Sequence, residues 1–217
     1  MATAPLVTAN GARIPALGLG TWPMKGETCE AAVTAALQCG YRHIDTAAMY
    51  GNEAEVGRGL RASGVARNDV WITTKVWWEN LGERELRRSA EASLAALGLA
   101  HVDLLLIHWP NPRIPLAESI GALCAAKRAG LARHIGISNF PTALMDEAVR
   151  LTSEPIVTNQ VEYHPHLDQT KVLANARRHG MAVTAYCPLG RGSVGGVLDE
   201  PAVMAIAKAR GCSPAEV

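Results

Sequence analysis

Two patterns of apolar and polar residues alternate along the chain, one typical of amphipathic helices and one typical of short buried strands. Most of the helical segments stop at a glycine, which is favoured just beyond a helix C-terminus. We expect helices over Thr28–Gln38, Asn52–Ser63, Glu83–Leu97, Pro115–Ala129, Pro141–Leu151, Asp168–His179 and Glu200–Arg210. Short, mostly continuous apolar runs lie between them, as in a sheet covered on both faces. We expect strands over Tyr41–Asp45, Val70–Thr74, Val102–Ile107, His134–Ile137, Ile156–Gln160 and Ala182–Tyr186.

The N-terminal segment has a different pattern. Leu6 to Ile14 contains the dipeptide Asn10-Gly11, which is a strong signal for a two-residue β-hairpin. Gly18-Leu19-Gly20 follows, but no third glycine opens a helix, so the segment does not match a dinucleotide-binding fingerprint. We therefore expect a tight turn at Gly18–Gly20.

Strands that alternate with helices of this length predict βαβ units and a parallel sheet, either open or closed into a barrel. In an open sheet the site gathers at a switch point between a few strands, whereas in a barrel it draws on the ends of many. Polar or aromatic residues follow nearly every expected strand here: Asp45, Lys75, His108, Ser138-Asn139, Gln160 and Tyr186. This favours a (β/α)8 barrel, of which the chain holds about six βα units and the hairpin in one incomplete domain over residues 1–217.

The segment from Gly40 to Gly57 holds the first candidate chemistry. Asp45 ends a strand, Tyr50 follows on a loop, and Asn52 stands where an N-cap residue would begin the next helix. The carboxyl ends of the strands are where active sites lie in barrel enzymes. We therefore expect Asp45 and Tyr50 to share a rim with Lys75 and His108.

Each of these residues also has a purely structural explanation. Asp45 could pair with Arg42, and His108 could be a hydrogen-bonded core residue. Lys75 could be a solvated strand end, but Val76-Trp77-Trp78 beside it indicate burial, and a buried lysine needs a counter-charge. The combination of an acid, a base, a phenol and an imidazole on one rim favours a catalytic site.

Composition narrows the function classes. The 217 residues suffice for one domain with a sizeable core, and the net charge of +1 indicates neither a nucleic-acid surface nor an anionic-membrane surface. No apolar run is long enough to span a bilayer. The five cysteines are scattered without a CxxC pair, and the first residues lack a basic stretch followed by an apolar run. We expect reduced thiols, no signal peptide and a cytoplasmic protein.

A metal site is not expected. His164 and His166 are separated by Pro165 and have no carboxylate or thiolate nearby that would complete a ligand set.

Five segments together resemble the signatures of the aldo-keto reductases, and the resemblance extends over essentially the whole chain. It is most like the bacterial 2,5-diketo-D-gluconate and methylglyoxal reductases of that family. The segments are Gly40–Ala47 with Glu53 and Gly57 downstream, Ile72–Trp77, Asp103–Pro110, Gly136–Phe140 and Asn159–Pro165. The resemblance implies an enzyme that reduces aldehydes or ketones to alcohols with a nicotinamide cofactor.

The resemblance also implies roles for the four rim residues. Tyr50 would be the general acid that protonates the carbonyl oxygen, and His108 would orient that carbonyl. Lys75 would lower the pKa of the Tyr50 phenol by stabilising the phenolate, and Asp45 would hold Lys75 charged and oriented.

The implied cofactor is NADPH, with NADH left open. The implied cofactor-binding residues are Thr21, Trp22, Asp45, Ser138, Asn139, Gln160, Tyr186, Pro188, Leu189 and Gly190. Ser138, Asn139 and Gln160 would bind the carboxamide, Tyr186 would stack on the ring, and Pro188–Gly190 would lie along the pyrophosphate. Cys187 stands where the family usually has serine, so we leave it out of the site. The implied substrate-binding residues are Trp22, Tyr50, Trp77, His108 and Trp109.

The C-terminal end departs from the family pattern. We count six strands where the family barrel has eight, and Ser213-Pro214-Ala215-Glu216 is a helix-start signal shortly before Val217. We therefore expect a shortened form of a longer reductase, in which no residue present decides between NADPH and NADH.

We expect a monomer that acts on a small carbonyl compound. Two other functions stay open at this point. One is a Schiff-base enzyme that uses Lys75, and the other is a nicotinamide-binding module without turnover.

Overall fold

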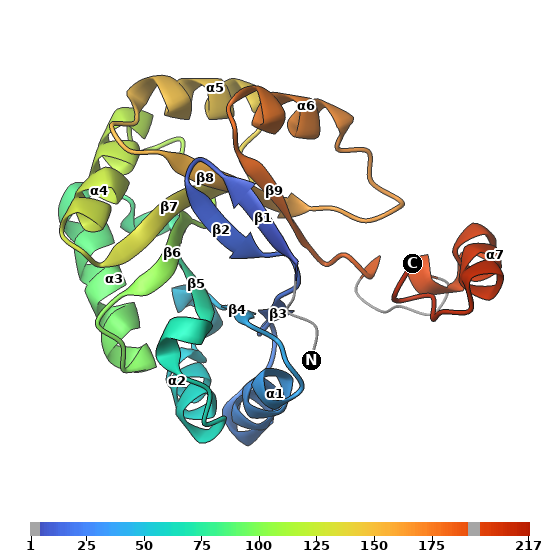
Figure 1. Ribbon diagram of the computed structural model, residues 1–217. Coiled ribbons are helices and arrows are strands. Elements are labelled where there is room, and N and C mark those ends of the chain that lie inside the picture. Colours follow the sequence, from blue (N-terminus) through green and yellow to red (C-terminus); the bar gives the residue numbers. More distant parts are fainter. Residues whose placement is uncertain (1–4, 191–195) are drawn as a thin grey trace.

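The computed structural model describes residues 5–190 and 196–217, so the segment 1–4, which bears on a signal peptide, lies outside it. A seven-stranded parallel sheet curves into a nearly closed barrel with its strands in chain order from β3 to β9 (Figure 1). The strands are β3 (Leu19–Gly20), β4 (His43–Asp45), β5 (Trp71–Val76), β6 (Val102–Ile107), β7 (Ala132–Ser138), β8 (Ile156–Glu162) and β9 (Ala182–Tyr186).

Helices α1 to α6 form an arc around the outside of this sheet, and α7 lies apart from the arc (Figure 1). The seven α-helices of the described chain are α1 (Gly26–Gln38), α2 (Glu53–Ala62), α3 (Glu83–Leu97), α4 (Leu116–Arg128), α5 (Thr142–Leu151), α6 (Thr170–Arg178) and α7 (Pro201–Arg210). The expected helices are all present, and the six βα units run from β3–α1 to β8–α6. The α/β barrel expected from the alternating pattern is therefore confirmed.

The continuous apolar runs of the strands follow from burial on both faces. In β6, Leu104 and Leu106 face the barrel interior, whereas Leu105 and Ile107 belong to the core between sheet and helices. All four side chains are at most 2% exposed. Because neighbouring residues of a strand point to opposite faces, a strand with two buried faces has no polar alternation.

A two-stranded hairpin closes the barrel end from which the parallel strands start. It consists of β1 (Leu6–Ala9) and β2 (Ala12–Pro15), and its turn residues Asn10 and Gly11 have φ of 43° and 84°. Ala12 and Ile14 pack against Leu104, Leu106 and Val157 inside the barrel. The Asn10 amide donates to the carbonyls of Ile156 (2.7 Å) and His179 (3.0 Å). The expected hairpin is thus confirmed, and the opposite end of the barrel is left for the site.

The structure differs from the sequence expectation at Gly18–Gly20. Leu19 and Gly20 form the short strand β3, which pairs with β4 through Leu19–Ile44 and Gly20–Asp45. The expected tight turn is therefore wrong. A strand of two residues has no periodicity of its own, and only its pairing with β4 reveals it.

The two ends of the sheet, β3 and β9, have no further strand between them in the described part of the chain. Beyond β9, the main chain and side chain of Ser213 bond the Glu216 carboxylate (2.6 and 2.7 Å), and the Glu216 amide returns a bond to the Ser213 hydroxyl (3.3 Å). The capping-box hydrogen bonds are therefore present.

None of the helices in residues 5–190 and 196–217 has the length and apolar character that a membrane crossing would require.

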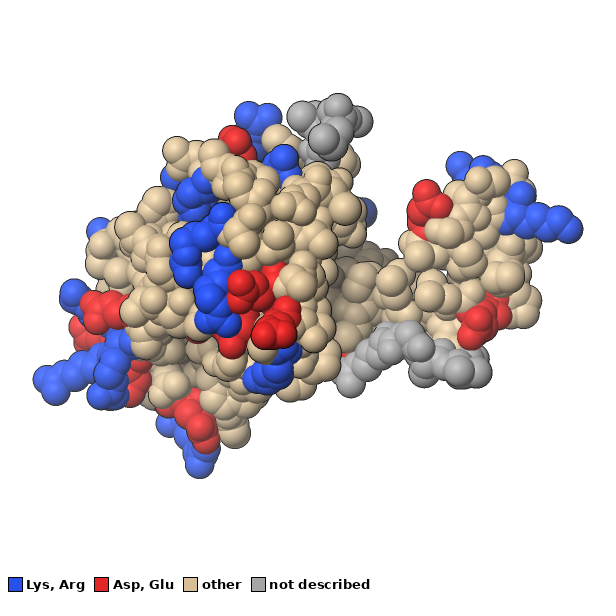
Figure 2. Space-filling model, turned by 90° about the horizontal axis from the view of Figure 1, so that it is seen from below, with Lys and Arg blue, Asp and Glu red and all other residues tan. Residues whose placement is uncertain are grey.

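Charged side chains of both signs lie next to one another on the face of the molecule seen in Figure 2. Ion pairs join neighbouring helices, such as Arg58 of α2 with Glu30 of α1 (2.6 Å). Exposed pairs of this kind contribute little to stability, so the buried contacts of the barrel dominate.

Gly57 is where α2 packs most closely on the end of α3. A Cβ atom at Gly57 would lie 2.3 Å from the carbonyl oxygen of Leu97, which is main chain and cannot swing away. We expect Gly57→Ala to lower the free energy of unfolding by about 1–3 kcal/mol, measured by urea denaturation. Gly121, on the exposed face of α4, has nothing within 4 Å of such an atom. Gly121→Ala should therefore raise stability by about 0.5–1 kcal/mol. Equal effects of the two changes would contradict this packing.

Candidate active site

Lys75 lies inside the barrel at the end of β5, and its side chain is 0% exposed. Its ammonium group donates to the Asp45 carboxylate, to the carbonyl of Thr46 (2.9 Å) and to the hydroxyl of Tyr50 (3.2 Å). The sequence placed Lys75, Asp45 and Tyr50 on one rim, and the structure brings them into direct contact. All three ammonium protons therefore have acceptors, as a buried lysine requires.

The charge of Lys75 is stabilised by its neighbours. Burial lowers the pKa of Lys75, but Asp45 and Tyr50 raise it by more, so its pKa lies above the ordinary value. Asp45 is in turn held from across the barrel, because the Gln160 amide of β8 donates to its second carboxylate oxygen at 2.7 Å. Arg42 is not its partner, since that guanidinium donates to the carbonyls of Leu37 and Tyr41.

Tyr50 lies at the end of a short 3-10 turn (Ala48–Tyr50) and is half-buried. Burial raises the pKa of its phenol, and Lys75 opposes this shift without cancelling it. Lys75 thus lowers this pKa as expected, but the net pKa lies above its ordinary value, because desolvation of the phenolate is the larger effect. In the described residues the Tyr50 hydroxyl accepts from Lys75 and donates to none, which leaves its proton for an incoming acceptor.

His108 follows β6 and packs edge-on against Tyr50, with ring centroids 5.6 Å apart. Burial and then Lys75 lower the pKa of His108 to about 4, and Asp45 opposes them only in part. The imidazole is therefore neutral at pH 7 and keeps one N–H donor. Its buried Nδ1 has no hydrogen-bond partner among the described residues.

Tryptophan side chains flank the two central rings. The Trp22 ring lies 5.2 Å from that of Tyr50, and the Trp77 ring lies 5.3 Å from that of His108. Trp22 is 56% exposed and Trp109 is 44% exposed, which is unusual for such large apolar groups. Trp22 and Trp77 thus border the reactive side chains, whereas Trp109 has no ring contact with them among the described residues.

A second set of polar groups connects the ends of β6 to β9. The Ser138 hydroxyl donates to the carbonyl of Gln160 (2.8 Å). The Asn139 amide donates to the carbonyl of His108 (3.0 Å), and the Tyr186 hydroxyl donates to the Asn139 carbonyl oxygen (3.0 Å). Asn139 has a φ of 63°, a left-handed conformation that asparagine tolerates better than most residues. The structure therefore brings these four residues together beside His108.

These residues fit a nicotinamide. Its carboxamide needs both donors and acceptors, and the hydroxyl of Ser138 and the amides of Asn139 and Gln160 supply both. The Thr21 hydroxyl is buried and has no hydrogen-bond partner in the described chain, so it too can bind an added polar group. Tyr186 adds a flat ring beside them.

The turn after β9 carries the three residues expected along a pyrophosphate. The Gly190 amide donates to the carbonyl of Cys187 (2.9 Å) in this turn, which includes Pro188 and Leu189. Cys187 and Gly190 both have positive φ, at 49° and 65°. No hydrogen bond of Pro188, Leu189 or Gly190 reaches the residues around Lys75 in the described chain, so their binding role stays a prediction.

Asn52 is a residue whose role the sequence did not reveal. It occupies the N-cap position of α2, but its side chain makes no capping bond. Instead its carbonyl oxygen accepts from the Thr46 hydroxyl (2.8 Å), and its amide donates to the carbonyls of Thr21 (3.1 Å) and Met24 (3.0 Å). It is 0% exposed and ties the loop that carries Tyr50 to the loop that carries Trp22. Thr21 and Met24 are distant from Asn52 in the sequence, so local spacing could show only a cap.

Each of the two histidines considered for a metal lies beside a carboxylate, so the expectation that no carboxylate is near them is wrong. His164 faces Glu162 (3.3 Å) and His166 faces Glu200 (2.8 Å). No group of three or more metal-ligating side chains that could hold an ion occurs in the described parts of the chain.

Comparison with known families and sequences matches nearly the whole chain. The model of the aldo/keto reductase family matches residues 16–215. The methylglyoxal reductase DkgB of Escherichia coli O157:H7 is 44% identical over 207 residues, which cover 94% of this chain and 76% of that protein. An aldo-keto reductase of Mycolicibacterium vanbaalenii is 44% identical over 205 residues, covering 94% of this chain and 72% of that protein.

Solved structures agree with these sequence matches. A structure provisionally described as a 2,5-diketo-D-gluconic acid reductase B has a TM-score of 0.94 and 50% identity, covering 97% of this chain and 74% of its own. The aldo-keto reductase of Bombyx mori in complex with NADP has a TM-score of 0.90 and 34% identity, covering 99% of this chain and 78% of its own. The chain thus spans about three quarters of the length of these relatives.

The neutral state of His108 can be measured directly. We expect the His108 imidazole to show a pKa of about 4 when its ring signals are followed by NMR. Because this pKa lies below that of the unfolded chain, the unfolded state takes up the proton first, and His108 makes folding less favourable as pH falls from about 6.5 towards 4. Lys75→Met should raise the His108 pKa, because a nearby positive charge is removed. A wild-type pKa above 6 would contradict the proposed environment.

Proposed function

Because the chain belongs to the aldo/keto reductase family, and so is a nicotinamide-dependent oxidoreductase, we propose that it reduces small dicarbonyl compounds such as methylglyoxal with NADPH, using Tyr50 as the general acid. The observation that carries this proposal is the direct contact of Lys75 with both Asp45 and Tyr50, next to His108. The names of two relatives, a methylglyoxal reductase and a 2,5-diketo-D-gluconic acid reductase, support the substrate class.

The proton is supplied by Tyr50 in this proposal. A raised pKa keeps the phenol protonated at neutral pH, which suits a group that must give a proton to a carbonyl oxygen. Lys75 then stabilises the phenolate that is left, because its ammonium group lies within hydrogen-bond distance of the Tyr50 oxygen. Asp45 keeps that ammonium charged and fixed in place.

In this proposal the carbonyl substrate is held by His108 and by the tryptophan side chains. A neutral His108 donates its N–H to the carbonyl oxygen, so the oxygen lies between two donors, the imidazole and the phenol. Trp22, Trp77 and Trp109 exclude water and contact the carbon skeleton.

The reduced nicotinamide, when bound, supplies the hydride, which no amino-acid side chain can provide. Ser138, Asn139 and Gln160 would hold its carboxamide, Thr21 and Trp22 would also contact the cofactor, and Pro188–Gly190 would lie along the pyrophosphate of the dinucleotide. The preference for NADPH over NADH rests on the family alone.

The geometry weighs against the Schiff-base alternative. A Schiff-base lysine must attack as a free amine, but Lys75 has a raised pKa and is fully buried with three acceptors around it. A binding module without turnover would not need Asp45, Tyr50, Lys75 and His108 assembled at one point. The free cysteines support a reducing compartment, so we also propose a cytoplasmic enzyme. That the enzyme is a monomer stays a prediction.

Tyr50→Phe tests the acid. We expect turnover of methylglyoxal, followed as NADPH oxidation, to fall by about 10²–10⁴-fold because the proton donor is gone. NADPH binding, followed by fluorescence titration, should be unchanged. Tyr41→Phe is the matched control, since Tyr41 precedes β4 on the opposite rim and should keep normal turnover. Near-normal reduction by Tyr50→Phe would remove Tyr50 from this role.

Lys75→Met tests the coupling between the lysine and the phenol. The reaction should slow, because the phenolate is no longer stabilised. Turnover in the reductive direction is lost as pH rises through the Tyr50 pKa, and removal of the cation raises that pKa, so the alkaline limb of the pH–rate profile should move to higher pH. Asp45→Asn should also slow the reaction, but less than Lys75→Met does, because Lys75 then keeps its charge in part. A limb at the same pH in Lys75→Met would show that the two groups are not coupled.

A further inference from the structure

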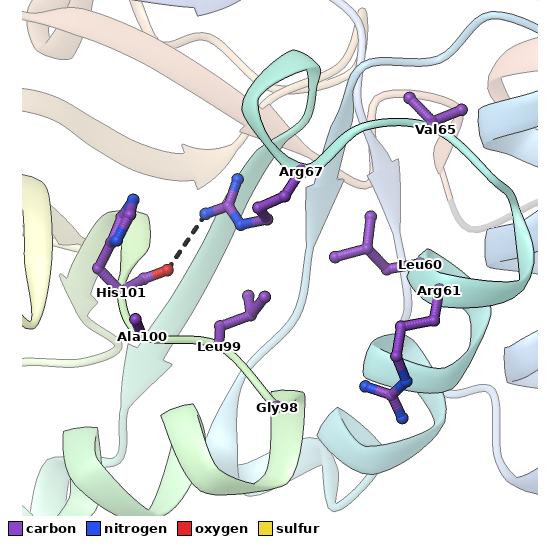
Figure 3. Close-up of a pocket in the computed structure, with 8 residues that line it drawn as sticks. All are labelled: Leu60, Arg61, Val65, Arg67, Gly98, Leu99, Ala100 and His101. Atoms are coloured by element: carbon purple, nitrogen blue, oxygen red, sulfur yellow. Dashed lines mark hydrogen bonds between the residues drawn. The ribbon is translucent and has the colours of Figure 1, made fainter.

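A cavity of about 420 Å³ lies at the barrel end opposite to the reductase site. Its lining comes from the C-terminal turn of α2, from the segment that precedes β5, and from the turn between α3 and β6 (Figure 3). The eight lining residues are Leu60, Arg61, Val65, Arg67, Gly98, Leu99, Ala100 and His101. Its volume is in the range of small-molecule sites. None of the residues around Lys75 takes part, so the cavity is separate from the proposed catalytic function.

One wall of the cavity carries a fixed arginine. Arg67 donates to the carbonyls of Val70 (2.6 Å) and His101 (3.1 Å, dashed in Figure 3) and pairs with Asp103 (2.7 Å). Asp103 is shared, because Arg133 also pairs with it at 3.2 Å. One carboxylate thus faces two guanidinium groups, which leaves this cluster with one positive charge.

A second arginine reaches the cavity without an acidic partner. The Arg61 guanidinium has a single long hydrogen bond to the carbonyl of Leu97 (3.5 Å), and no carboxylate of the described chain lies within ion-pair distance of it. No acidic side chain lines the cavity. The cavity therefore carries positive charge that no carboxylate in its lining balances.

The rest of the lining is apolar. In Figure 3, Leu60 lies between Arg61 and Arg67, and Leu99, Ala100 and Val65 complete the wall. Gly98 keeps room beside Arg61, because a Cβ atom there would lie 2.8 Å from Nη1 of that side chain. A ligand with a charged head and a compact apolar body would match both parts of the surface.

We propose that this cavity binds a small organic oxyanion, a carboxylate or phosphate ester with an apolar body of a few carbons, through Arg61 and Arg67. Arginine is suited to such a head group, because its planar fork bonds two oxygens at once. The apolar body contacts Leu60, Val65 and Leu99.

Benzoate is a suitable probe, and benzyl alcohol is its uncharged counterpart. Titration of ¹⁵N-labelled protein with benzoate should shift the amide signals of residues 98–101 in a saturable way. Benzyl alcohol should bind there at least about 10-fold more weakly, because it has no charged oxygens for the guanidinium groups. Signals of Trp22 and His108 are followed in the same spectra, so that binding at the reductase site is recorded separately.

Two variants on α2 make the test specific. Arg61→Gln should weaken benzoate binding at residues 98–101 by about 10-fold or more, since it removes the charge and leaves a shorter, neutral amide. Arg58→Gln is the matched control, because Arg58 lies one turn earlier and pairs with Glu30 and Glu55 outside the cavity. It should change the affinity by less than about twofold. The proposal is overturned if benzoate shifts only the signals of the reductase site. It also fails if Arg61→Gln binds as the wild type does, or if benzyl alcohol binds as tightly as benzoate.

Discussion

The structure depends on one buried cation. The ammonium group of Lys75 has no access to water, so folding removes its hydration and must replace it with acceptors in fixed positions. The replacement comes from β4 and from the loop that follows it, through Asp45, the carbonyl of Thr46 and the hydroxyl of Tyr50. The replacement also depends on the closure of the barrel. The Gln160 amide, on β8 at the other side of the barrel interior, donates a hydrogen bond to the Asp45 carboxylate. A substitution that moves these acceptors away would leave the Lys75 charge buried without its partner.

The same arrangement sets the chemistry of its neighbours. The interior is poorly solvated and already holds a cation, so His108 stays neutral, and Tyr50 stays protonated although Lys75 favours its phenolate. Asn52 keeps the loop that carries Tyr50 near Thr21 with three hydrogen bonds, two of them buried, and adds no charge. The hairpin fills the opposite end with Ala12 and Ile14, which leaves the carboxyl ends of the strands for ligands. The hairpin that closes the barrel and the reactive side chains therefore lie at opposite ends of the barrel.

Much of this could be predicted from the sequence, because apolar periodicity reports burial directly. The helix Glu83–Leu97 and the strand Val102–Ile107 have the expected bounds, and the polar residues that end the strands identified the rim. What could not be predicted depends on packing. The strand Leu19–Gly20 exists only through its pairing, and the partners of Asn52 are far along the chain. The net pKa shift of Tyr50 depends on how deeply the ring is buried. The cavity beside Arg61 requires two turns, after α2 and after α3, to meet in space.

The central claim is that Asp45 keeps the buried Lys75 charged, and the titration of that lysine tests it most directly. With lysine labelled at Cε and Nζ, the Lys75 signals can be followed by NMR against pH in the wild type and in Asp45→Asn. The account predicts a Lys75 pKa above that of exposed lysines in the wild type. In Asp45→Asn it predicts a value below theirs, because burial then acts without its counter-charge. A Lys75 that titrates like exposed lysines in both proteins would contradict the account.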